Sequence, residues 1–168
     1  MKRKLKNSKG FTLVEMMVTV VILSIIVLGL VTFFSGGMRS WVSGQSQLKA
    51  QREARQAMDR MVREIREGDK IIDTSTNSAI NFHTPFKGNM SFSYNSSERE
   101  IKEGTVSLIQ NVKNCTITYY DKNKVLIDPS SESDKVSIVK INLEIDVDND
   151  NNTDIHLKSE ISLRNFNL

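Results

Sequence analysis

Hydrophobic and polar positions divide the chain into three patterns, of which the first is a long apolar run. This run extends from Phe11 to Phe34, and Glu15 is the only charged side chain within it. A helix over these residues would span roughly 36 Å at about 1.5 Å per residue, enough to cross the hydrocarbon core of a bilayer. Glu15 would then lie near one end of a membrane helix, where an unpaired carboxylate is costly. The pattern predicts a membrane-spanning helix whose carboxylate needs a partner.

The second pattern is an amphipathic continuation of this helix to about Glu67, with Gly68 as its C-terminal cap. Residues 45–67 contain no proline and are rich in strong helix formers. Spacings of three and four residues place one set of apolar side chains on a face suited to packing on a sheet: Ala54, Ala57, Met58, Met61, Val62 and Ile65. The opposite face is charged and consists of Arg52, Glu53, Arg55, Arg60, Arg63, Glu64 and Arg66.

Glycines gather between the two halves of this helix. Gly29, Gly36, Gly37 and Gly44 each weaken a helix by about 1 kcal/mol relative to alanine. We therefore expect residues 35–44 to bend or to melt locally.

The third pattern begins at Asp69 and consists of short alternating runs rich in Ile, Val, Thr, Ser, Asn and Lys. It predicts six strands: Ile80–His83, Met90–Tyr94, Val106–Gln110, Thr116–Tyr120, Val136–Val147 and Thr153–Arg164. Two adjacent apolar residues, Ile138 and Val139, indicate a bulge in the fifth strand. Together the three patterns predict an α+β fold. A long N-terminal helix, membrane-spanning in its first half and amphipathic in its second, packs on a C-terminal antiparallel β-sheet.

Charge gives the predicted membrane helix an orientation. Residues 1–10 carry five basic side chains, Lys2, Arg3, Lys4, Lys6 and Lys9, and no acidic one. The positive-inside rule keeps such a segment cytoplasmic and predicts that residues beyond about 35 lie on the other side. Without residues 1–10, 18 Lys and Arg remain against 20 Asp and Glu, a side-chain net charge of −2. The net charge therefore does not indicate nucleic-acid binding. The acidic residues interspersed on the arginine-rich helix face favour a surface that is solvated or packed against neighbouring subunits.

The junction between the basic segment and the apolar run carries the most specific motif, residues 9–15 with the order Lys-Gly-Phe-Thr-Leu-Val-Glu. This motif resembles the N-terminus of type IV prepilins and pseudopilins. The resemblance implies that a prepilin peptidase cleaves after Gly10 and that the new amine of Phe11 is methylated. It also implies that Glu15 pairs with the N-terminal amine of a neighbouring subunit during filament growth. An ammonium group is the kind of partner that a carboxylate in apolar surroundings needs.

Two other interpretations of the N-terminus explain less. A secretory signal has an apolar core of about 7–15 residues followed by a small-residue cleavage site, whereas this run is longer and its cleavage-like junction precedes it. A plain single-pass anchor explains the length of the run but not the order of residues in the motif. We therefore expect four regions: a cleaved leader, 1–10; a transmembrane and assembly helix, 11–34; its amphipathic continuation, 35–68; and an extracytoplasmic β-rich head, 69–168.

Residues beyond the membrane span indicate which subfamilies the chain resembles. The segment 54–66 and the C-terminal segment 161–165 resemble PilW-like minor pilins and J-type pseudopilins. The expected function is that of a structural subunit, a minor pilin of a type IV pilus; the alternative is a pseudopilin of a type II secretion or competence DNA-uptake system. The expected partners are other pilin subunits, the prepilin peptidase, the cytoplasmic membrane and the pilus assembly platform. The expected location is a single-pass membrane precursor and then a cell-surface pilus or pseudopilus.

Residues that could carry other chemistry are few. Oxygen ligands alternate along Asp146, Asp148, Asp150, Asn152 and Asp154, as hard cations such as calcium prefer, but the glycine and distal glutamate of an EF-hand are missing. A solvated turn without a metal or other cofactor is the simpler interpretation. The lone Cys115 predicts a buried thiol, and His83 and His156 are far apart in sequence. No nucleophile and base stand in a catalytic pattern, so the sequence predicts that the chain is not an enzyme.

Overall fold

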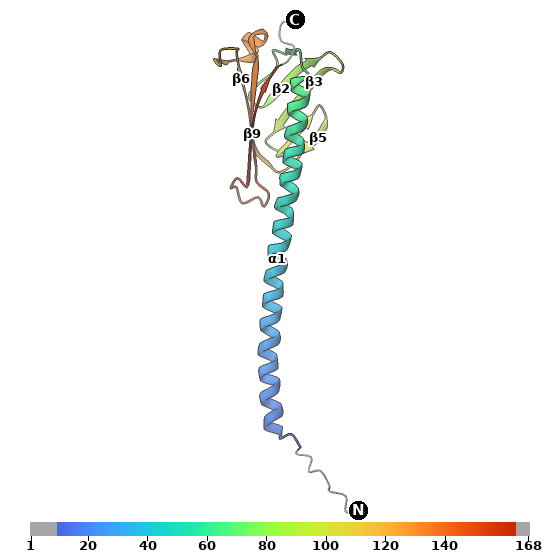
Figure 1. Cartoon of the computed structure of the whole chain (residues 1–168), viewed down its shortest axis with the longest axis vertical. Coiled ribbons are helices and arrows are strands. Elements are labelled where there is room, and N and C mark those ends of the chain that lie inside the picture. Colours follow the sequence, from blue (N-terminus) through green and yellow to red (C-terminus); the bar gives the residue numbers. More distant parts are fainter. Residues whose placement is uncertain (1–9, 164–168) are drawn as a thin grey trace, which may run out of the picture. The chain divides into compact units, whose positions relative to one another are not determined.

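A computed structural model describes residues 10–163 of the chain. Predictions that concern the basic leader up to Lys9, or Arg164 and Asn165, lie outside the described residues. The chain divides into two compact units, residues 1–45 and residues 46–168, which are described in turn. The first helix, α1 (Leu13–Arg66), contributes to both units (Figure 1).

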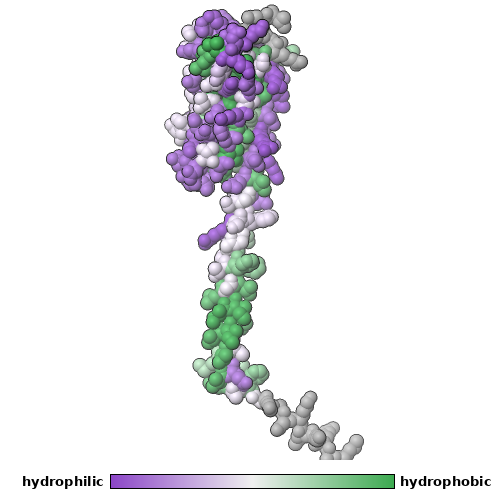
Figure 2. Space-filling view, turned by 60° about the vertical axis from the view of Figure 1, so that its left-hand side comes forward, coloured by the Kyte–Doolittle hydropathy of each residue, from purple (hydrophilic) through white to green (hydrophobic). Residues whose placement is uncertain are grey.

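The described part of the first unit is the N-terminal portion of α1, an apolar helix with exposed side chains. Figure 2 shows a hydrophobic surface along this part of the helix. Among the described residues, α1 is the one helix whose length and composition allow it to cross a membrane. The helix also runs without interruption through residues 35–44, so the predicted local melting is wrong. Glycine, unlike proline, keeps its N–H group, and the ladder of backbone hydrogen bonds therefore survives a cost of about 1 kcal/mol per glycine.

The second unit begins with residues 46–66 of α1, which place an apolar face against two sheets. The prediction of this face is confirmed for Ala54, Ala57, Met58, Met61 and Ile65, which are all buried, whereas Val62 is half-buried. The sequence was misleading at one position. Glu64, predicted on the charged and solvated face, is buried, and its carboxylate accepts hydrogen bonds from Lys87 Nζ at 2.5 and 2.6 Å.

All pairs of neighbouring strands are antiparallel, and they form two sheets where the sequence predicted one. The five-stranded sheet has the order β1 (Lys70–Ile71), β2 (Ala79–Thr84), β3 (Gly88–Asn95), β4 (Glu100–Glu103) and β5 (Val106–Ile109). The four-stranded sheet has the order β7 (Leu126–Ile127), β6 (Val112–Tyr120), β8 (Ile138–Ile145) and β9 (Ile155–Ser162). A short helix α2 (Pro129–Glu132) and a 3-10 turn η1 (Ser133–Lys135) connect β7 to β8. The predicted α+β class, a long helix packed with antiparallel sheet, is confirmed.

Each of the six predicted strands overlaps an observed one, and the differences have local causes. The three missed strands, β1, β4 and β7, have two to four residues, too few for an alternating pattern to stand out. The predicted bulge at Ile138 and Val139 is wrong, because both residues pair in continuous register with β9. The register of this sheet instead shifts between Val112 and Asn114 on β6.

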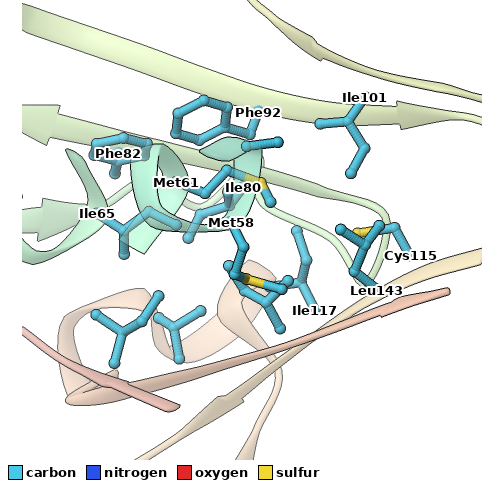
Figure 3. Packing of buried hydrophobic residues seen from close by; sticks show 14 of the residues in the cluster. Met58, Met61, Ile65, Ile80, Phe82, Phe92, Ile101, Cys115, Ile117 and Leu143 are labelled. Carbon is cyan, nitrogen blue, oxygen red and sulfur yellow. The ribbon is translucent and has the colours of Figure 1, made fainter. Parts of the chain in front are cut away.

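One hydrophobic core joins the helix to both sheets (Figure 3). Met58, Met61 and Ile65 of α1 meet Phe82 and Phe92 from the five-stranded sheet, whose rings stack with centroids 5.9 Å apart. From the four-stranded sheet, Cys115, Ile117 and Leu143 complete the cluster. Helix α1 and both sheets of this unit therefore share one core.

Gly68 ends the helix by close packing and not as a left-handed cap. Helix α1 ends at Arg66, and the amide of Gly68 donates a hydrogen bond to the carbonyl oxygen of Ile65 at 3.0 Å. A Cβ atom at this position would lie 3.0 Å from that oxygen and 3.2 Å from the ring of Phe82. A side chain at this position would therefore force its neighbours to shift by a few tenths of an ångström, which glycine avoids.

Candidate functional site

Thr12 and Glu15 hydrogen-bond to each other at the first turn of α1. Thr12 directly precedes the helix, and its carbonyl oxygen accepts the first hydrogen bond of the helix, from Met16 N at 3.2 Å. The amide and hydroxyl groups of Thr12 both donate to Glu15 Oε2 at 2.9 Å, and Glu15 N donates back to Thr12 Oγ1 at 3.3 Å. This is a capping box, in which a threonine before the helix and a glutamate three residues later satisfy amides that the helix leaves unpaired.

Thr12 is the functional residue that the sequence interpretation missed. A Thr-x-x-Glu spacing directly before an apolar run is a known signature of a helix N-terminus and would have identified it. The sequence predicted that Glu15 needs a partner, and the structure supplies a local one. The negative carboxylate also lies at the positive end of the helix dipole, which stabilises it further.

Gly10 and Phe11 lie immediately before this capping box. Both precede the helix and are exposed, and Phe11 exposes 78% of its surface. The peptide bond between them therefore lies in non-helical, accessible backbone. The two predicted processing positions and Glu15 are within one short segment. An amine formed at Phe11 would be next to Thr12, whose amide already binds the Glu15 carboxylate.

Comparison with known proteins addresses this same segment. Residues 5–31 match the family model described as the prokaryotic N-terminal methylation motif. This segment is similar to the N-terminus of type IV pilins and pseudopilins. A search of curated proteins found no match. The family match confirms the resemblance inferred from residues 9–15 and, together with the long apolar helix, supports prepilin-type cleavage and methylation and a transmembrane helix.

The match also indicates the general role of the chain. It indicates a structural subunit rather than an enzyme and implies assembly with other pilins and processing by a prepilin peptidase. The motif and the apolar N-terminal helix fit a membrane-anchored precursor. The exposed apolar side chains of α1 agree with this, because a surface of that size in water is covered by lipid or by other subunits.

A second cluster of polar side chains lies in the loop between β8 and β9, where the sequence offered a candidate cation site. Oxygen atoms of Asp146, Asp148 and Asp154 lie within 4.8 Å of one another. Asp150 is not in this group; its carboxylate accepts hydrogen bonds from the backbone and side-chain amides of Asn152, at 2.7 and 2.8 Å. The structure therefore brings three of the five predicted residues together, and the other two pair with each other.

The carboxylates of this loop differ in their electrostatic surroundings. Burial raises the pKa of Asp146, but hydrogen bonds from Arg99 and from the Asn151 amide outweigh it, so the pKa is lowered from its ordinary value. At Asp148 the hydrogen bond from the Asp150 amide lowers the pKa, yet burial and repulsion from the neighbouring carboxylates leave it raised. Hydrogen bonds thus dominate at Asp146, whereas repulsion between carboxylates is felt at Asp148.

The remaining residues that the sequence singled out are dispersed. Cys115 is buried on β6, and burial raises the pKa of its thiol to about 12, as predicted for a structural cysteine. His83 on β2 contacts Asp69 at 2.8 Å, whereas His156 on β9, in the other sheet, contacts Asn142. Because these three side chains lie on different strands with separate partners, the structure does not assemble them into one site.

Proposed function

We propose that this chain is a minor subunit of a type IV pilus, matured by cleavage between Gly10 and Phe11 and assembled through its N-terminal helix. The observation that carries the proposal is the match of residues 5–31 to the methylation motif, directly over the capped start of an apolar helix. The resemblance of segments 54–66 and 161–165 to PilW-like minor pilins and J-type pseudopilins, both low-abundance subunits, favours a minor over a major subunit. The head after the helix would then lie outside the cytoplasmic membrane.

Cleavage at Gly10 is supported by the backbone around the bond. Residues 10–12 are not helical, and a Cβ atom at Gly10 would meet nothing within 4 Å. A peptidase needs such accessible, non-helical backbone, and cleavage there leaves the capping box intact because Thr12 and Glu15 are both on the product side. Methylation of the Phe11 amine would keep its positive charge.

Assembly is supported by the capacity of the Glu15 carboxylate to accept further hydrogen bonds. Both hydrogen bonds from Thr12 end on Oε2. An ionised carboxylate has roughly four acceptor positions, so it can bind an ammonium group while it still caps the helix. An ion pair between Glu15 and the Phe11 amine of an adjacent subunit would remove the cost of both charges in apolar surroundings, while the exposed apolar side chains of α1 cover one another.

The experiment that tests the proposal is intact-mass analysis and N-terminal sequencing of the protein sheared from the surface of its native cells. We expect a chain that begins at methylated Phe11. The matched variant is Gly10→Ala, which should retain residues 1–10 and stay in the membrane fraction. A chain in the sheared material that still carries residues 1–10 would contradict the processing claim. A correctly processed chain that never enters sheared filaments would instead support a pseudopilin of a secretion or DNA-uptake system.

A further inference from the structure

The side chain of Asp146 is fully buried and only half satisfied. Its Oδ2 atom accepts hydrogen bonds from Arg99 Nη2 at 2.8 Å and from Asn151 N at 3.1 Å. Its Oδ1 atom is buried without a hydrogen-bond partner, the one such side-chain atom among the described residues 10–163. A buried acceptor left unpaired destabilises a folded protein, so a group that binds Oδ1 would stabilise this loop.

The loop around Asp146 is shaped to bring other oxygen ligands to it. Asp146 follows β8 directly, and Asp154 precedes β9 directly. Asn149 and Asn151 adopt left-handed φ angles of 61° and 67°, which turn the chain back on itself. As a result, oxygen atoms of Asp146, Asp148 and Asp154 gather within 4.8 Å of one another. Ligands at about 2.3–2.6 Å from a calcium ion lie at most about 5 Å apart, so three oxygens this close fit around one ion.

The net charge at this turn is negative and therefore favours a bound cation. Four carboxylates are present at positions 146, 148, 150 and 154, and two basic side chains contact the loop. Arg99 donates to Asp146 and to Asn149 Oδ1, and Lys113 Nζ donates to the Asn151 carbonyl oxygen at 2.7 Å. The four negative and two positive charges leave a net charge of −2, which one divalent cation neutralises.

We propose that Asp146, Asp148 and Asp154 bind a calcium ion in the loop between β8 and β9. Asp146 supplies its unpaired Oδ1 while Arg99 holds Oδ2, and the two exposed carboxylates close the site from the solvent side. Calcium fits better than magnesium because it accepts irregular oxygen cages, whereas magnesium requires near-ideal octahedral geometry. The bound ion would fix the start of β9 relative to the end of β8. This proposal is independent of pilin processing, which concerns the other end of the chain.

The test uses the full chain in detergent, stripped of metal by chelation and titrated with calcium chloride or magnesium chloride in a calorimeter. We expect saturable calcium binding with a Kd of about 10⁻⁴–10⁻³ M, the range of extracellular modules, and weaker magnesium binding. At ten times the Kd, calcium should raise the Tm by about 4 °C. The informative variant is Asp148→Asn, because the asparagine keeps an acceptor for the Asp150 amide, which donates to Asp148 Oδ1 at 3.2 Å.

The matched control is Asp150→Asn, which removes the same charge from the same loop but from a residue outside the group. We expect Asp148→Asn to weaken calcium binding by about tenfold or more and Asp150→Asn by about twofold or less. Equal losses in the two variants would mean diffuse attraction by an acidic loop and would overturn the site. The absence of saturable heat at about 10 mM calcium would also overturn it, as would magnesium binding as tight as calcium binding.

Discussion

Glu15 Oε2 accepts two hydrogen bonds from Thr12, one from its amide and one from its hydroxyl group, each at 2.9 Å. The carboxylate proposed to hold a neighbouring subunit therefore also caps the helix of its own chain. Capping needs an acceptor oxygen, which a glutamine also provides. Pairing with an ammonium group across an apolar interface needs the negative charge. The two roles can therefore be separated by substitution.

We predict that Glu15→Gln and Glu15→Ala both enter the membrane and are cleaved, but that neither enters filaments efficiently. Glu15→Ala additionally loses the cap, at a cost of about 0.5–2 kcal/mol of helix stability. Sheared filaments and membranes would be compared by immunoblot, with Thr12→Ser as the control because serine keeps the hydroxyl group. Normal incorporation of Glu15→Gln would show that the capping hydrogen bond alone suffices and would remove the pairing argument.

The buried pair of Glu64 and Lys87 should contribute measurably to folding. The Glu64 side chain is 7% exposed and that of Lys87 is 48% exposed. Lys87→Ala leaves the buried carboxylate without its cation, and we expect the free energy of unfolding to fall by about 1–3 kcal/mol. Chemical denaturation would measure it. The control is Lys135→Ala, which breaks an exposed ion pair with Glu132 and should cost about 0.5 kcal/mol or less. Equal effects would mean that the pair at Glu64 is no more than a surface contact.

Cys115 should be unreactive while the chain is folded. Only 4% of its surface is exposed, and burial raises the pKa of the thiol to about 12. Because the thiolate is the reactive form, we expect a thiol reagent at neutral pH to label the native protein far more slowly than the denatured protein. The chain has one cysteine, so the labelled mass reports this site alone. Rapid labelling of native protein would mean that β6 opens or that the core is less closed than described.

The free energy of unfolding should depend on pH through the ionisation of Glu100. Hydrogen bonds from Lys102 and Ser107 lower the pKa of this carboxyl from 4.5 to about 2. Because the folded-state pKa is lower, the contribution of Glu100 to stability is fully present above the ordinary value. It is lost as the pH falls through that value toward about 2. We expect Glu100→Gln to be less stable than the wild type at neutral pH and the difference to shrink below about pH 4.5.

Denaturation curves across this pH range would check the prediction on Glu100. Asp73→Asn, a substitution at an exposed carboxylate, serves as the control. A stability difference between wild type and Glu100→Gln that stays constant from neutral to acidic pH would mean that the effect arises from packing and not from the charge.

Several features of this protein were determined by the sequence alone, because they depend on residues close together in the chain. The apolar run predicts a membrane-spanning helix. The spacing of Ala54, Met58, Met61 and Ile65 predicts the buried face of the continuation of this helix. Both predictions rest on local patterns in the sequence. The motif at residues 9–15 identified the family segment by the same local order. The alternation along β8 likewise predicted its buried positions, whereas on β9 Ile161 is buried and Ile155 and Leu157 are half-buried.

Other features were decided only by the tertiary structure, because they depend on residues that the fold brings together. The division into two sheets follows from long-range strand pairing, such as that of β6 with β8, which no local pattern encodes. The spacing of Glu64 along the helix predicts a solvated residue. The fold instead places it beside Lys87, which lies 23 positions further along the chain. The unpaired Oδ1 of Asp146 arises in the same way, since Arg99 from the turn between β3 and β4 binds one oxygen of that buried carboxylate and leaves the second without a hydrogen-bond partner.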